Sequence, residues 1–144
     1  MKAAYLYKLA SFVRWPDGAA QGGRFRFCIV GNKEISGALA ELVRGQRVEG
    51  LPASVERIDP AQPGQVRSCQ IVFVGQRNDA GALMTAASGR PILTVADRSG
   101  GIRGGVVDFV MREGKVRFVI DRAMARRQQV ELSSKLLETA LAVE

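Results

Sequence analysis

Phe25-Arg26-Phe27-Cys28-Ile29-Val30, followed by Gly31-Asn32, is the stretch that decides the fold of this chain. It is an almost continuous apolar run that ends at a glycine. Runs of this kind are typical of strands inside a parallel sheet, where helices cover both faces. Two later runs, 71–75 and 91–96, have the same character. The sequence therefore predicts three buried, neighbouring strands.

Segments with helical spacing of apolar residues alternate with these strands. They lie at 3–13, 36–44 and 80–87. Residues 46–58 alternate weakly around a Gly-Leu-Pro turn and predict two short strands, or one strand entered from a hairpin. Strands that alternate with helices favour a mostly parallel sheet. We expect an α/β fold of the Rossmann-like, three-layer type.

The end of the chain has a different pattern. Residues 106–111 and 115–120 are strand-like and are separated by a short turn, which predicts an antiparallel hairpin. Asp121 can cap a short helix, and 132–141 predict a closing amphipathic helix. Because no linker or internal repeat divides the sequence, we expect a single domain over 1–144.

The composition excludes several classes of enzyme. The 144 residues include two cysteines and no histidine. Ser–His and Cys–His catalytic pairs and histidine-based metal sites are therefore excluded, and two cysteines are too few for an all-cysteine metal site. The carboxylates Asp108, Asp121, Glu131 and Glu138 have no spacing that makes a general acid–base pair. We expect no enzymatic activity, no metal and no cofactor.

The net charge is +7, from 21 Lys and Arg against 14 Asp and Glu. The excess is spread along the chain, and the aromatic residues lie mostly in apolar runs. Nucleic-acid-binding proteins usually place aromatic residues among the basic ones. We therefore expect no nucleic-acid partner. The densest basic cluster, Arg122, Arg126 and Arg127, is more simply a solvated helix face than a phosphate site.

A glycine-dense loop, Asp97–Gly105, is the best local candidate for a site. It offers free backbone amides, the guanidinium groups of Arg98 and Arg103, and one carboxylate. These groups could hold an acidic small ligand or an acidic partner surface, although a mobile surface loop is the simpler interpretation. The turns 31–37 and 75–79 also follow buried strands, but neither has a nucleotide-binding glycine motif.

Two features leave the compartment open. Cys28 and Cys69 fall on neighbouring predicted strands, and their spacing fits a disulfide and two buried free thiols equally well. No stretch approaches the roughly 20 apolar residues that span a bilayer. The opening residues 1–15 do not resemble a signal peptide. The protein is either cytoplasmic or begins after a signal that was removed.

Several blocks of the chain, in order and over almost its whole length, resemble the YfiR/HmsC-like family. The opening block is similar to a family run of the form KAAYLYNFAKFVEWP, and a later block is similar to the pattern C-[HQ]-[IV]-[LV]-F. The matching blocks are Ala3–Pro16, Phe27–Gly31, Ser68–Val74, Pro91–Asp97, Gly104–Val107, Val116–Asp121 and Val130–Leu137.

The resemblance implies a periplasmic regulator whose signal peptide is missing from this sequence. Members of the family repress a membrane-bound diguanylate cyclase by binding its periplasmic sensor domain, which lowers cyclic di-GMP and biofilm formation. An outer-membrane lipoprotein can sequester them, and they can form homodimers. The resemblance also implies a disulfide between Cys28 and Cys69. A second cysteine pair, present in some members near the glycine loop, is absent here.

The resemblance gives no catalytic residues, and we expect partner contacts at Arg98, Ile102 and Arg103 in the glycine loop and at Glu131. Two other functions stay open from the sequence. One is a small-molecule sensing module that uses the carboxyl end of the sheet. The other is a cytoplasmic nucleotide-binding enzyme with free thiols.

Overall fold

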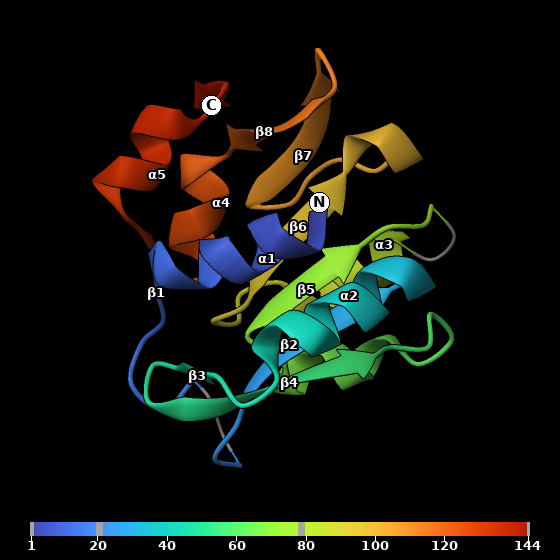
Figure 1. The fold of residues 1–144 in the computed structure, drawn as a ribbon, viewed down its shortest axis with the longest axis vertical. Coiled ribbons are helices and arrows are strands. Elements are labelled where there is room, and N and C mark those ends of the chain that lie inside the picture. The colour runs from blue at the N-terminus through green and yellow to red at the C-terminus, as the bar shows by residue number, and fades with distance from the viewer. Residues whose placement is uncertain (1, 20–21, 78–79, 144) are drawn as a thin grey trace.

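A computed structural model describes residues 2–19, 22–77 and 80–143 of the chain. It is a mixed α/β structure with a large sheet and several helices (Figure 1). The strands are β1 (Val13–Arg14), β2 (Phe25–Val30), β3 (Arg47–Val48), β4 (Leu51–Arg57), β5 (Ile71–Val74), β6 (Leu93–Asp97), β7 (Val107–Arg112), β8 (Lys115–Ile120), β9 (Glu131–Leu132) and β10 (Ala142–Val143).

The helices are short, and none within the described ranges is long and apolar enough to cross a membrane. Two of the helical segments, η1 and η2, are 3-10 helices. The helical segments are α1 (Lys2–Ser11), α2 (Lys33–Val43), η1 (Pro63–Ser68), α3 (Ala80–Ala87), η2 (Arg98–Gly100), α4 (Arg122–Arg127) and α5 (Ser134–Thr139).

The large sheet has eight strands in the order β10-β8-β7-β6-β5-β2-β4-β3. The strands from β7 to β4 in this order run parallel, whereas β8 and β3 are antiparallel to their neighbours β7 and β4. β10 is parallel to β8. The expectation of a mostly parallel sheet is confirmed, and β6 and β5 are its two central strands, with β2 beside β5.

Each face of the sheet packs in its own hydrophobic cluster, as the alternating side chains of a strand require. Phe27 and Phe73 belong to one cluster, together with residues of α1 and α2. Cys28 and Val72 belong to the other, together with residues of η1 and α3. Figure 1 shows α1 and α2 in front of the strands and α3 behind them. Helices on both sides explain why the strands are apolar on both faces.

A small second sheet joins a segment near the start of the chain to one near its end. Val13 and Arg14 of β1 pair antiparallel with Leu132 and Glu131 of β9. The Ser133 amide also donates to the Phe12 carbonyl. The pairing holds the exit of α1 against the segment that enters α5. The sequence analysis missed this sheet because two-residue strands leave no periodic signal.

Several element boundaries differ from the predictions. α2 begins at Lys33, before the predicted start, because the Asn32 side chain accepts the Ile35 amide and caps the helix. The predicted helix over 132–141 is wrong at both ends. Leu132 belongs to β9 and pairs with β1, and the helix ends at Thr139, before β10 begins at Ala142. Only the segment capped by Ser133, Ser134–Thr139, is helical.

We predict opposite effects for two Gly→Ala substitutions. A Cβ on Gly105 would lie 2.9 Å from the backbone oxygens of Thr94 and Val107, and this rigid crowding should destabilise the fold by about 2 kcal/mol. A Cβ on Gly37, inside α2, meets nothing within 4 Å, so Gly37→Ala should stabilise by about 1 kcal/mol. Urea unfolding measures both. A Gly105→Ala protein as stable as the wild type would contradict the close packing.

Candidate functional site

Candidate functional groups lie at both ends of the central strands. β2, β5 and β6 have their amino ends at Phe25, Ile71 and Leu93, beside the disulfide. Their carboxyl ends lead into the turn at Gly31, the turn at Gly75 and the glycine loop. The two ends have different chemistry.

At the amino end, Cys28 and Cys69 form a disulfide, as the family resemblance implied. It joins β2 to the segment between η1 and β5, and their Cα atoms are 6.0 Å apart. Both cysteines are buried in the cluster beneath α3. The bond links residues 41 positions apart, so it constrains a long loop of the unfolded chain.

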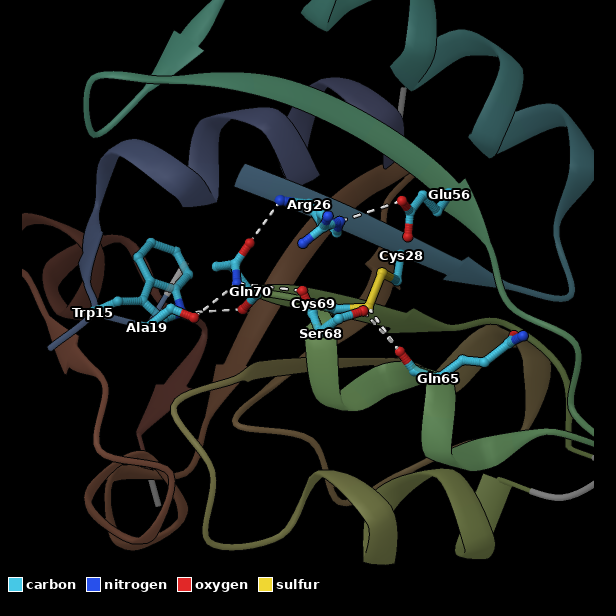
Figure 2. The surroundings of a disulfide bond; sticks show 9 residues. All are labelled: Trp15, Ala19, Arg26, Cys28, Glu56, Gln65, Ser68, Cys69 and Gln70. Atoms are coloured by element: carbon cyan, nitrogen blue, oxygen red, sulfur yellow. Dashed lines mark hydrogen bonds and ion pairs between the residues drawn. A yellow bond between two sulfur atoms is a disulfide. The ribbon is translucent and has the colours of Figure 1, made fainter. Parts of the chain in front are cut away.

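Gln70, next to the disulfide, connects four segments of the chain (Figure 2). Its side-chain oxygen accepts the Arg26 amide at 2.7 Å, and its side-chain nitrogen donates to the Ala19 carbonyl at 3.1 Å. Its own carbonyl accepts the Trp15 indole nitrogen at 3.0 Å and the Leu93 amide at 2.8 Å. Because Gln70 is only 1% exposed, each of these bonds replaces water that cannot reach it.

At the carboxyl end, the glycine loop is held by two buried carboxylates. Asp97 accepts from the Ser99 amide and from the ammonium group of Lys2, 2.7 Å away. Asp108 accepts from the Gly105 amide at 3.0 Å and from Arg98 Nε at 2.9 Å. The expectation of free amides is wrong for Ser99 and Gly105, because carboxylates of the chain itself occupy them. No pattern in the sequence indicated that Asp108 of β7 would contact this loop.

The four predicted partner-contact residues are not gathered in one place. Arg98 pairs with Asp108, and Arg103 is exposed. Ile102 is 4% exposed and packs in the cluster beneath α3, so its side chain is not available to a partner in this structure. This corrects its assignment as a surface contact. Glu131 is exposed but lies in β9, paired with Arg14 beyond the end of α1.

The glycine loop and the β7–β8 hairpin together form a hollow of about 420 Å³. Its basic side chains are Arg98, Arg103 and Arg112, and Met111 beside them is 43% exposed. We call these four residues the arginine surface. No carboxylate lines the hollow among the described residues. Since Asp108 neutralises Arg98, the remaining positive charge comes from Arg103 and Arg112.

The turns after β2 and β5 lie close to each other. A Cβ on Gly31 would meet the Gln76 side chain at 2.5 Å, and a Cβ on Gly75 would meet the Val30 oxygen at 3.3 Å. The Gly75 oxygen is in turn close to Gly100. These turns pack against each other rather than around an open phosphate cradle. Asn78 and Asp79, also considered for this turn, lie outside the described residues.

No group of three or more acidic or cysteine residues within 2–19, 22–77 and 80–143 is arranged to hold a metal ion. The sequence analysis also missed Gln70, Met111 and Arg112. Gln70 carried one signal, since it is a polar residue directly after a cysteine at the start of a buried strand. No feature of the sequence pointed to Met111 or Arg112, because only the folded hairpin places them beside the glycine loop.

The comparison with protein families gives one result that covers nearly the whole chain. A family model described as YfiR/HmsC-like matches residues 1–141. A search of curated proteins found no match.

We predict that the Cys28→Ala/Cys69→Ala protein is less stable than the oxidised wild type by about 4 kcal/mol, as expected for a cross-link that closes a loop of 41 residues. Guanidinium unfolding measures the difference. Dithiothreitol should lower the midpoint of the wild type and leave that of the variant unchanged. Equal midpoints for the oxidised wild type and the variant would rule out a stabilising role.

We predict that Asp108→Asn destabilises the fold by about 2 kcal/mol, because it removes a buried carboxylate charge that pairs with Arg98, which is 25% exposed, and accepts the Gly105 amide. Urea unfolding again measures the change. Arg44→Gln is the matched control, since the Arg44–Glu41 pair is more than two-thirds exposed, and its effect should stay below about 1 kcal/mol. Equal effects of the two substitutions would contradict the structural role of Asp108.

Proposed function

The chain belongs to the YfiR/HmsC-like family, and on this premise we propose that it is a non-enzymatic periplasmic regulator. It represses a membrane-bound diguanylate cyclase by binding the periplasmic sensor domain of that enzyme, and so lowers cyclic di-GMP and biofilm formation. The observation that carries the proposal is the family match over 1–141. We include residues 1–144 in a single regulatory domain.

The buried disulfide supports the proposed compartment. Disulfides persist in the oxidising periplasm and are rare in the reducing cytosol. A small domain that must survive outside the cytosol also gains from a cross-link. The family resemblance adds two further parts to the proposal: an outer-membrane lipoprotein sequesters the regulator, and two copies can form a homodimer.

We assign partner binding to the arginine surface. Its charge and its exposed methionine suit a sensor-domain face that presents acidic side chains around an apolar residue. Arg98 and Arg103 remain in this assignment, and Met111 and Arg112 are added. Ile102 supports the loop from beneath, and Glu131 lies apart from it.

The experiment deletes the gene in the bacterium that encodes the chain and measures cyclic di-GMP. Deletion should raise cyclic di-GMP, and restoring the exported protein should lower it again. A form without an export signal, made at the same level, should not restore repression, because it cannot reach a periplasmic domain. Unchanged cyclic di-GMP after deletion, or full repression by the unexported form, would contradict the proposal.

We predict that Arg103→Glu/Arg112→Glu abolishes repression at unchanged protein level, because it reverses the charge of the arginine surface. Arg24→Glu/Arg127→Glu is the matched control, with the same change of charge at exposed arginines outside that surface, and it should repress normally. Cyclic di-GMP and co-purification with the cyclase are the measurements. Normal repression by the Arg103→Glu/Arg112→Glu variant would contradict the assignment of partner binding to the arginine surface.

The alternative is a periplasmic small-molecule sensing module with a Rossmann-like, three-layer fold. In such folds ligands bind outside the carboxyl ends of the strands. Here the turns at Gly31, Gly75 and Gly100 approach one another, and carboxylates occupy the amides of the glycine loop. We therefore favour protein recognition at this end of the sheet.

A further inference from the structure

A pocket of about 410 Å³ lies at the amino end of the central strands, beside the disulfide. Its volume is in the range of small-molecule sites. Three segments far apart in sequence form it, namely the turn after β1, the η1 segment and the turn before β6. The lining residues are Gly18, Ala19, Gly64, Gln65, Arg67, Ser68, Cys69, Arg90, Pro91 and Ile92.

The walls of this amino-end pocket are fixed by bonds to the core. Cys69 is held by the disulfide, and the Ala19 carbonyl accepts from Gln70. On the third side, Gln128 donates to the Ile92 carbonyl at 3.2 Å and accepts the Gly89 amide at 2.8 Å. Gln128 itself is only 2% exposed. A preformed wall saves a ligand the cost of ordering loops when it binds.

The charged side chains that line the described part of the pocket are all positive. Arg67 and Arg90 both line it, both are exposed, and neither forms an ion pair within the described part of the chain. No carboxylate is among the described lining residues. Two unneutralised guanidinium groups over a concave surface attract anions and can form charge-assisted hydrogen bonds with a carboxylate or phosphate.

The floor of the pocket is partly apolar. Pro91 and Ala19 line the pocket and are half-buried, so part of their apolar surface is accessible. A purely inorganic anion would leave this surface unused, whereas a ligand with an apolar body would cover it. Ser68 and Gln65 add polar groups to the rim.

We infer that the amino-end pocket binds a small organic anion, whose carboxylate or phosphate pairs with Arg67 and Arg90 and whose apolar body covers Pro91 and Ala19. The site is separate from the arginine surface and does not rest on the proposed function. Because Cys69 lines it, the ligand contacts the segment that the disulfide anchors. The pocket lies at the end of the central strands opposite the arginine surface.

The test is isothermal titration of the oxidised, full-length chain with four probes. Phenyl phosphate and benzoate carry an anion on an apolar ring and distinguish the two anionic groups. Benzamide is the neutral control, and inorganic phosphate is the anion without a ring. We expect saturable binding of phenyl phosphate, benzoate or both, no saturable binding of benzamide, and weaker binding of inorganic phosphate than of phenyl phosphate.

Substitutions localise the binding. Arg67→Gln and Arg90→Gln should each weaken binding by about tenfold, the loss expected for one charge-assisted hydrogen bond. Arg57→Gln/Arg117→Gln is the matched control, because these exposed arginines do not line the pocket, and it should bind as the wild type does. Unfolding curves and thiol titration confirm that each variant is folded and oxidised.

Backbone NMR gives an independent readout. Phenyl phosphate or benzoate should shift the amide signals of Gly18, Gly64 and Ser68 and leave those of Gly104 and Gly105 in place. The inference is overturned if neither organic anion binds saturably, if benzamide binds as well as they do, if the control variant loses as much affinity as Arg67→Gln, or if the shifts map to the glycine loop. Equal affinity for inorganic and phenyl phosphate would overturn the role of the apolar floor.

Discussion

Gln70 is the residue on which the arrangement of the amino end depends. It lies where β5 begins, between β2 and β6, and it is almost fully buried. Its hydrogen bonds reach the turn after β1, the start of β2 and the start of β6. The adjacent disulfide then fixes this junction to β2 covalently. A buried amide in such a place is stable only when all its groups are paired, and this requirement fixes the relative positions of the segments around it.

The carboxyl end is organised by charge rather than by a covalent bond. Asp97 and Asp108 are buried, and each accepts from at least one backbone amide and from one basic side chain. These contacts turn a glycine-rich segment into a fixed loop, and they leave Arg103 and Arg112 as the charges that face outward. Some of the basic side chains that are spread along the sequence therefore come together in three dimensions, at two places. One concentration lies beside the glycine loop and another beside the disulfide.

Long, strongly patterned segments were predictable, and short ones were not. β2 and β5 follow from almost continuous apolar runs that end at a glycine, and α3 follows from the helical spacing of its apolar residues. β1, β9 and β10 have two residues each, so no period exists to detect, and their strand geometry depends on partners elsewhere in the chain. Those partners also explain why the last helix is shorter than its amphipathic pattern suggests. For the candidate site, the loop and two of its arginines were predictable, but Met111 and Arg112 were not, because a hairpin supplies them.

By itself the sequence determined the mixed α/β character with a mostly parallel sheet, the absence of histidine chemistry and the family, because composition, period and ordered motifs are properties of the chain alone. The tertiary structure decided which side chains meet. It made Ile102 a core residue, paired Arg98 with Asp108, separated Glu131 from the glycine loop and placed Arg67 and Arg90 around one pocket. These outcomes depend on contacts between residues far apart in sequence, which only the packing of both sheet faces establishes.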